Sequence, residues 1–475
     1  MKSIIYHYIL FTGIAFITLS CNTSNLAIKS TNTLPASYPE QQDSLNIALI
    51  NYKEYFQDSL LTSLIDTALH NNYDVLMALQ RIQAAQANYH VAKGSLLPYV
   101  SAFGSIAQRK FGLYTMDGAG NISTEMRPGE IVPIHLRNYT VGLQTAWEAD
   151  LWGRLNNRKK AAYARYLARQ EGRHLITTSL VAEIAITYYD LVALDQELEI
   201  VRETIQLQEN ALSIVKAQKE AASANELAVK QFSAQLLNSK AMEKIIAQQI
   251  VEAENKINFL LGRLPQPVAR MKMNSTAPAT TLIQSGVPSD LLQNRPDIRE
   301  AEYELIASNA DVKSAKAAFY PSFTITGAYG FEAYKTAFLF YTPESIAYSL
   351  IGSLAAPLIN RSAIKAEFNA TKASQLEALY NYQKSILNGY IEVYNELSEI
   401  KNLAEEATLR VNEAQELTEA VNVSNQLFLT GRANYVEVLL VQKTSLDAKL
   451  QLIDTRRRQH FATVNLYKAL GGGWR

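Results

Sequence analysis

The side chains that most often do chemistry in proteins form no reactive arrangement in this sequence. The chain of 475 residues has six histidines and one cysteine, and the histidines do not show the spacing of metal ligands. The glycine run at 471–473 lacks the lysine and the serine or threonine of a phosphate-binding loop. It is more typical of a helix end. No serine, cysteine or carboxylate cluster has a catalytic context, so we predict no enzyme activity, no metal site and no cofactor.

Charge and composition narrow the class of protein. Lysine plus arginine and aspartate plus glutamate both total 45, so the chain lacks the basic field expected of a dedicated nucleic-acid binder. Its hydrophobic content of 48% is enough for a substantial core. Arg456, Arg457 and Arg458 could contact a phosphate or lipid head group. Charge runs on helices are usually solvated or ion-paired, and we predict an ion-paired helix face.

The single cysteine, Cys21, has a position that suggests covalent modification. A basic start is followed by the apolar run Ile4–Leu19 and then by Ser20 and Cys21, which is the pattern of an export signal. A lone thiol directly after such a segment resembles the lipid acceptor of bacterial lipoproteins. We therefore predict a signal peptide at 1–20 and attachment of lipid, including palmitate, to Cys21. Thr18 departs from the usual motif, and the alternative is an ordinary signal peptide.

The two halves of the chain resemble each other. Asp74 and Asp297 are 223 positions apart, as are Pro98 and Pro321, with similar residues around them. Self-similarity at a long spacing is the sequence signature of structural repeats. The predicted organisation is given by these ranges: a lipidated, extended N-terminal arm at 21–57, repeat 1 at 58–263, a proline-rich linker at 264–288 and repeat 2 at 289–475.

Each half reads as a helix, two strands and then two very long helices. Proline cannot continue a helix, so we predict that the helix near 59–97 stops at Pro98 and that strands follow Pro98 and Pro321. Apolar residues then recur at three- and four-residue steps, as in coiled coils. Breaks near 222–225 and 431–434 predict sharp turns. A helix of about 65 residues would be close to 100 Å long, too long for a compact domain.

Four segments of alternating character predict β-hairpins at about 99–147 and 322–356. Tyr139, Val141, Leu143 and Trp147 face one side of their strand, and polar or small residues face the other. Aromatic residues gather at both membrane surfaces of β-barrels, and about ten residues span a bilayer as a tilted strand. We predict membrane-interface positions for five aromatic residues: Trp147, Tyr139, Phe323, Tyr329 and Tyr348.

A sheet in the membrane must close, because each unpaired edge group in hydrocarbon costs several kcal/mol. Four strands are too few, since small barrels start near eight, whereas three chains would supply twelve. The predicted fold class is mainly α with transmembrane β. It is a closed β-barrel shared among chains, with four strands per chain, continuous with a long tube of α-helical coiled coils. The alternative is a soluble sheet covered by the chain's own helices.

Four stretches resemble the signature stretches of TolC-like outer-membrane efflux proteins, in their lipoprotein (NodT/OprM-type) branch. They are TAWEADLWGRL (Thr145–Leu155), QNRPDIREAEYEL (Gln293–Leu305), TGRANYVEVLLVQKTSL (Thr430–Leu446) and VNLYKALGGGW (Val464–Trp474). The resemblance spans nearly the whole mature chain and implies a lipid-anchored homotrimer in the cell outer membrane, with a large periplasmic part. In the implied fold, a trimeric 12-stranded β-barrel, with four strands per chain, is continuous with a long periplasmic α-helical coiled-coil barrel. The resemblance also implies a periplasmic adaptor (membrane fusion) protein and an inner-membrane pump, usually proton-driven, as partners.

The resemblance also assigns residues to the periplasmic tip, where the tube narrows and the adaptor docks. These are Ser223 and Asn225 in the first turn and Gly431, Arg432 and Asn434 in the second. The family often reads Leu-Asp-Ala-Gln where this chain reads Leu439–Gln442, so Leu440 stands in place of the aperture aspartate. A ring of carboxylates favours cations, and this departure puts cation preference in doubt unless Glu437 compensates.

The function expected from these features is the passive exit duct of a tripartite efflux system that carries small molecules, such as several drugs, out of the cell. Two alternatives remain open from the sequence. One is the outer-membrane duct of a type I protein secretion system. The other is a non-conducting, lipid-anchored coiled-coil scaffold of the envelope, which would have no transmembrane strands.

Overall fold

The computed structural model describes residues 34–35, 37–38, 46–272, 285–359 and 361–475. The chain divides into the units Met1–Pro35 and Ala36–Arg475, and the description below concerns the second. The predicted signal peptide, Cys21 and most of the predicted arm lie outside the described residues, as does 273–284 of the predicted linker.

The elements follow the predicted order of helix, strands and long helices, once in each half. The first half contains η1 (Ile47–Leu49), α2 (Tyr52–Tyr55), α3 (Ser59–Asn71), α4 (Tyr73–Gly94), β1 (Tyr99–Arg109), α5 (Met116–Ser123), β2 (Glu125–Arg127), β3 (Glu130–Ile131), β4 (Leu136–Ala149), α6 (Arg154–Glu220) and α7 (Glu226–Leu260). The second contains η2 (Pro288–Asp290), α8 (Leu291–Asn294), α9 (Pro296–Ala317), β5 (Ser322–Ala333), η3 (Thr336–Phe338), β6 (Ile346–Ala355), α10 (Arg361–Leu429) and α11 (Tyr435–Ala469).

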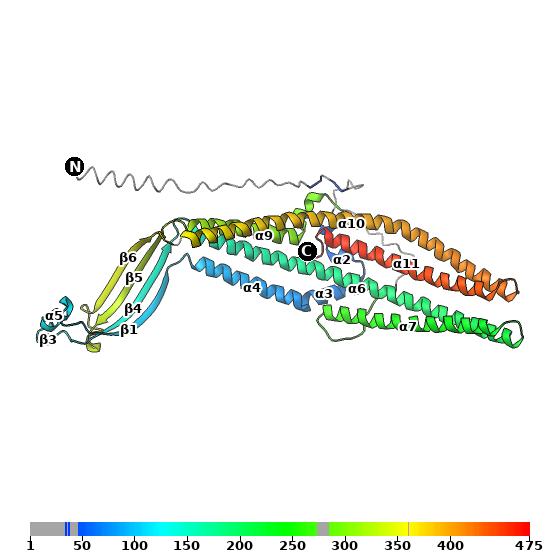
Figure 1. Cartoon of the computed structure of the whole chain (residues 1–475), viewed down its shortest axis with the longest axis horizontal. Coiled ribbons are helices and arrows are strands. Elements are labelled where there is room, and N and C mark those ends of the chain that lie inside the picture. Colours follow the sequence, from blue (N-terminus) through cyan, green and yellow to red (C-terminus); the bar gives the residue numbers. More distant parts are fainter. Residues whose placement is uncertain (1–33, 36, 39–45, 273–284, 360) are drawn as a thin grey trace. The chain divides into compact units, whose positions relative to one another are not determined.

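The four long strands form one antiparallel sheet in the order β1-β4-β5-β6. The pair β4–β5 joins the two halves of the chain, and β1 and β6 are the edge strands (Figure 1). A second, two-stranded sheet of β2 and β3 lies within the loop between β1 and β4. The edges of the larger sheet have no strand partner among the described residues, which leaves backbone groups there to be paired by another chain.

The strand register places the predicted apolar residues on one face. Leu143 is paired with Tyr329, Tyr329 with Tyr348, and Trp147 with Ile325, and directly paired residues of an antiparallel sheet share a face. Many apolar side chains of this face are exposed: Val100, Ile106, Leu143, Tyr329, Tyr348, Leu350 and Leu354. No helix of the described chain covers the sheet (Figure 1). The predicted alternative of a sheet covered by its own helices is therefore wrong.

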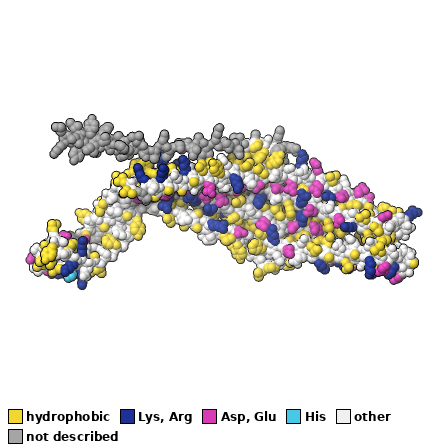
Figure 2. Space-filling view, viewed as in Figure 1, with side chains coloured by type: hydrophobic (Ala, Val, Ile, Leu, Met, Phe, Trp, Pro, Cys, Tyr) yellow, Lys and Arg dark blue, Asp and Glu magenta, His cyan; other side chains and the backbone are white. Residues whose placement is uncertain are grey.

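Charged side chains are confined to the ends of the four strands. No Asp, Glu, Lys or Arg occurs in 99–108, 138–147, 322–331 or 346–355. In Figure 2, charged side chains are spread over the helices and gather again at the far end of the strands, with few between. The sheet thus has an uncharged band about ten residues tall, the length of a tilted transmembrane strand.

Helix α6 is the centre of the helical part and packs on α4, α7, α9 and α11. Its buried residues include Ile184, Tyr188, Leu191, Val201 and Val215, which belong to an apolar stripe of the predicted periodicity. One stretch of α6 is apolar and long enough to cross a membrane, but 56% of that stretch is buried inside the protein. Burial against other helices accounts for its composition.

Three details of the predicted secondary structure are wrong. The helix predicted near 59–97 is two helices, because Asn72 leaves the helical conformation and its side chain accepts hydrogen bonds from the N–H groups of Asp74 and Val75. This is N-capping, which starts a new helix. The predicted extended arm contains η1 and α2 in its described part. Helix α4 ends at Gly94 and α9 at Ala317, so a short turn separates each helix from the following proline.

Matching contacts close each half. The Asn72 side chain donates to the Leu260 carbonyl at 2.9 Å, and Arg295 donates to the Ala469 carbonyl at 2.7 Å. Asn72 and Arg295 are 223 positions apart, the shift that aligns Pro98 with Pro321. Leu260 and Ala469 are 209 positions apart, and the residues that follow them, Leu261-Gly262 and Leu470-Gly471, are identical. Arg295 is 6% exposed and also binds the carboxylates of Asp297 and Glu392.

Candidate functional site

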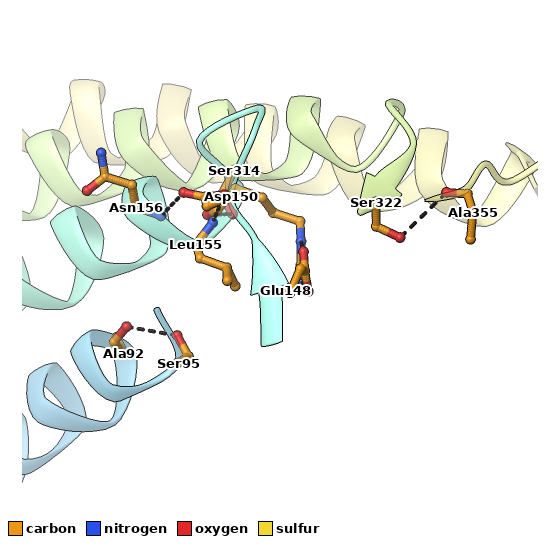
Figure 3. Close-up of polar contacts among 10 residues, drawn as sticks. Ala92, Ser95, Glu148, Asp150, Leu155, Asn156, Ser314, Ser322 and Ala355 are labelled. Carbon is orange, nitrogen blue, oxygen red and sulfur yellow. Dashed lines mark hydrogen bonds and ion pairs between the residues drawn. The ribbon is translucent and has the colours of Figure 1, made fainter. Parts of the chain in front are cut away.

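The junction between β4 and α6 turns the strand directly into a helix. Gly153 adopts a left-handed conformation (φ 73°) that other residues rarely adopt. The Asp150 carboxylate accepts hydrogen bonds from the N–H groups of Leu155 (2.9 Å) and Asn156 (2.8 Å), as Figure 3 shows. Negative charge stabilises a helix N-terminus, so Asp150 helps to start α6.

Further polar contacts fix the direction of the chain at the same junction. Arg154 binds the Glu148 carboxylate through two nitrogens, with Nη2 2.6 Å from Oε2. The Ser314 hydroxyl of α9 donates to the Arg154 carbonyl at 2.9 Å (Figure 3). Two-point binding between arginine and a carboxylate is directional as well as strong. The end of β4 is therefore held to the start of α6, and the start of α6 is held to α9, by defined contacts.

The aromatic residues predicted at the membrane interface share the apolar face but occupy both ends of it. Trp147 and Phe323 lie near the helical end of the sheet, and Tyr139, Tyr329 and Tyr348 lie toward the opposite end. Trp147 is half-buried, and its indole N–H donates to the carbonyl of Leu96 at 3.0 Å. Their place at the bilayer surfaces stays a prediction.

A second tryptophan at the junction has a role that the sequence did not reveal. Trp152 stacks on Tyr320, with ring centres 4.9 Å apart, and donates to the carbonyl of Pro321 at 2.7 Å. Its contact joins the end of β4 to the start of β5. Nothing in the local sequence indicates it, because Trp152 and Tyr320 are far apart along the chain.

The two predicted turns between long helices have the same backbone geometry. The N–H groups of Ser223 and Ala224 both donate to the Gln218 carbonyl, and those of Arg432 and Ala433 both donate to the Leu427 carbonyl. These bonds satisfy carbonyls that a helix end would otherwise leave unpaired. The left-handed position of this turn is Gly431 in the second half (φ 72°) and Ala222 in the first (φ 61°).

The helices after the turns begin with asparagine caps. Asn225 accepts from the N–H of Ala228, and Asn434 accepts from the N–H of Val436. Glu437 in turn accepts from the N–H of Asn434 at 3.2 Å, completing a capping box. Ser223, Gly431 and Arg432 are exposed at the turns. The structure therefore gives Asn225, Asn434 and Glu437 a role in starting their helices, and their contact with an adaptor stays a prediction.

Leu440 is on the outward side of α11. Val438 and Gln442 are buried, at 1% and 8% exposure, whereas Leu440 is 60% exposed. An exposed leucine near a helix tip has no packing role within its own chain. Its side chain is free to contact a partner protein or to line a channel.

The remaining candidates from the sequence have structural roles. Arg457 binds Asp190 and Asp454, and Arg458 lies near Glu399 and Glu406, so the predicted ion-paired face is confirmed for these two arginines. The glycine run at 471–473 follows the end of α11, as predicted. Within the described residues no group of three or more His, Cys, Asp or Glu is arranged to hold a metal ion.

Comparison with known proteins identifies relatives along almost the whole chain. Residues 64–263 and 287–472 match the family model described as "Outer membrane efflux protein". The toluene efflux pump outer membrane protein TtgI of Pseudomonas putida is 28% identical over 441 residues, 91% of this chain and 89% of TtgI. The probable outer membrane lipoprotein SilC of Salmonella typhimurium is 26% identical and covers 93% of this chain and 94% of SilC. Crystal structures of CusC superpose with a TM-score of 0.81 at 25% identity, covering 93% of this chain and 99% of CusC.

Proposed function

The chain belongs to the outer membrane efflux protein family and is an outer-membrane efflux channel protein, and from that premise we propose that three copies assemble into one channel. Each copy contributes four strands to a 12-stranded β-barrel. The long helices continue the wall as a periplasmic α-helical coiled-coil barrel. Each chain is built from two structural repeats, an organisation that the matching contacts of Asn72 and Arg295 support.

The observation that carries this proposal is the sheet. One face is apolar and exposed, and the other carries mainly small and polar side chains, with Tyr99, Phe103 and Ile351 as exceptions. Both edge strands lack a partner within the described chain. Unpaired edges cannot be left in hydrocarbon, so β1 of one copy must pair with β6 of another. The apolar face then meets lipid and the polar face lines water. An envelope scaffold without transmembrane strands would not need such a sheet.

The surface of α10 supports the same assembly. Several of its large apolar side chains are exposed: Tyr380, Leu387, Ile391, Tyr394 and Leu409. Exposed apolar surface of this extent marks an interaction site. Contact with the helices of a neighbouring copy would bury it and extend the wall of the channel beyond the sheet.

The turns at 221–225 and 430–434 form the periplasmic tip in this proposal. A periplasmic adaptor docks at the exposed residues Ser223 and Arg432, and a proton-driven inner-membrane pump delivers the cargo. Leu440 lines the aperture, where a leucine removes the negative charge that would favour cations. A lipid on Cys21 anchors each copy.

The cargo is proposed to be small molecules that pass through without binding tightly. TtgI is named for toluene efflux, whereas CusC is named a cation efflux system protein, and Leu440 in place of an aperture aspartate favours the former kind of cargo. Selection of the cargo then falls to the pump and the adaptor. The same reasoning favours efflux over a type I secretion duct, because no relative reported above is named as a secretion component.

Conductance in a planar bilayer tests the proposed function. The purified full-length protein is expected to conduct weakly at rest, and Leu440→Asp is expected to raise the preference for cations over anions. Leu227→Asp is the matched control, because Leu227 is a similarly exposed leucine (57%) near the other turn and is not assigned to the aperture. Absence of conductance from the unaltered protein and from both variants would contradict a channel.

A further inference from the structure

The two loops at the far end of the sheet are fastened to each other. Outer loop A is 110–135, between β1 and β4, and outer loop B is 334–345, between β5 and β6. The guanidinium carbon of Arg127 in loop A lies 4.2 Å from the ring centre of Phe338 and 4.6 Å from that of Tyr341, both in loop B. Lys335 Nζ lies 3.2 Å from the Glu130 carboxylate. Cations are attracted to aromatic faces, so these contacts hold the loops together. We call the five residues that make them the loop clasp: Arg127, Glu130, Lys335, Phe338 and Tyr341.

The loop clasp lies on the polar side of the sheet. Arg127 lines a cavity of about 370 Å³ together with Asn138, Glu332 and Ala347. The register places these three residues on the face opposite Leu143 and the other apolar side chains. Ala333 and Ile346, at strand ends on the apolar face, also line the cavity. The polar side chains that the strands contribute, Asn138 and Glu332, belong to the opposite face, and this points to outer loop A bending toward the face that lines the channel in the proposed assembly.

Outer loop A is an ordered segment. It contains α5 and the pair β2–β3, and the N–H of Val132 donates to the carbonyl of Thr124 at 2.9 Å. On the other side of the cavity, Glu332 accepts a hydrogen bond from Asn138 at 2.6 Å. Loop A can thus keep a defined position over the end of the sheet.

The tip of outer loop A exposes large apolar side chains. Leu113, Tyr114 and Met116 are 51%, 106% and 90% exposed. Apolar side chains that gather on a surface indicate a partner. Loop A directly follows β1, an edge strand that pairs with another copy in the proposed barrel. Its tip therefore starts at the boundary between copies, and the loop clasp directs it toward their common axis.

Resting on the proposed function, we propose that outer loop A closes the outer mouth of the channel to large solutes. The three copies of loop A meet through Leu113, Tyr114 and Met116, and the partner of this apolar surface is the same surface of the neighbouring copies. The loop clasp holds each copy of the loop inward. Large molecules then pass only when the clasp opens.

Labelling of a cysteine inside the barrel tests this closure in intact cells. Gln144→Cys places a thiol in the middle of β4, on the polar face. It is labelled from outside with either a small charged maleimide or a maleimide carried on a long polyethylene glycol chain. Arg127→Ala is expected to raise the labelling rate by the polymer about five- to thirty-fold, because two cation–π contacts are lost. Labelling by the small reagent is expected to be unchanged.

The control is Arg109→Ala. Arg109 lies 4.4 Å from the ring centre of Phe111 in its own hairpin and does not belong to the loop clasp, so its loss is expected to leave polymer labelling unchanged. Equal polymer rates with and without Arg127→Ala would overturn the closure. Failure of the small reagent to label position 144 would instead contradict the water-lined barrel of the proposed function.

Crosslinking tests the contact between copies independently. With a short bis-maleimide, Tyr114→Cys is expected to give covalently joined chains. Tyr348→Cys, also exposed (81%) but on the apolar face, is expected to give none. If Tyr114→Cys chains stay separate while Gln144→Cys is labelled by the small reagent, the tips do not meet and the proposal is wrong.

Discussion

Helices α6 and α10 have nearly the same length but very different surroundings. They contain 67 and 69 residues, yet α6 has 22 buried residues and α10 has five. The chain folds around α6, and α10 keeps large apolar side chains on its surface. Helix α6 therefore buries its apolar side chains against other helices of its own chain. Helix α10 packs on α9 and α11 of its own chain, and in the proposed assembly its remaining apolar surface packs on other copies. The two helices should therefore respond differently to the same kind of substitution.

The largest effect is expected from truncating a core side chain of α6. Ile184 is fully buried, and Ile184→Ala is expected to destabilise the folded chain by about 2–5 kcal/mol, through lost burial and the cavity left behind. Ile391→Ala removes the same atoms from α10, where the side chain is 45% exposed. It is expected to leave the fold intact and to weaken the association of copies. Thermal unfolding and native mass measurements of both variants check this contrast. Equal losses of thermal stability in the two variants would refute it.

Smaller effects on stability are expected at the two helix turns, where glycine should stabilise one turn and alanine should destabilise the other. Ala222 holds a left-handed conformation that costs a residue with a Cβ about 1–2 kcal/mol. Ala222→Gly is therefore expected to stabilise the first turn by about 1 kcal/mol, and Gly431→Ala to destabilise the second by a similar amount. A Cβ at 431 would meet no neighbouring atom, so the conformation alone sets the cost.

Protease resistance of the turns in the purified protein measures these changes. The control is Ala221→Gly, next to the left-handed residue but with φ −80°, where glycine should bring no gain. A stabilisation at 221 equal to that at 222 would show that left-handed strain is not the cause.

The smallest effect on stability is expected from the titration of a partly buried carboxyl group. Glu171 on α6 is 5% exposed and binds Arg299 at 2.7 Å. Glu396 on α10 has one carboxylate oxygen with no hydrogen-bond partner. Burial raises the pKa of Glu396 to about 7, and the charges of Glu399 and Glu392 act in the same direction.

A raised carboxyl pKa means that the folded chain holds a proton that the unfolded chain releases at lower pH. The stability from Glu396 is thus fully present below its ordinary value of 4.5 and is lost as the pH rises through about 7. Glu396→Gln should reduce the fall in melting temperature over this interval. Glu416→Gln, at an exposed site on the same helix, is the control. An unchanged pH profile for Glu396→Gln would show that the carboxyl does not titrate there.

The sequence was sufficient for those parts of the structure that depend on local patterns. Alternation along β4, β5 and β6 predicted which residues share a face, whereas β1 is less regular because Phe103 lies on the polar face. Glycine and asparagine at 431 and 434 predicted the second turn. The break at Asn72 was missed, because asparagine is tolerated within helices and its capping bonds form only when the chain bends. The loop clasp could not be predicted, since Arg127 and Phe338 are brought together only by the pairing of β4 with β5.

The account depends most on the claim that separate chains share one closed sheet. Native mass spectrometry of the full-length protein released from detergent tests it directly. We expect a single species with the mass of three chains. A double variant of the edge strand β6, Ser349→Pro with Ile351→Pro, is expected to give single chains, because proline removes ladder hydrogen bonds. A stable, folded species with the mass of one chain in the unaltered protein would contradict the account.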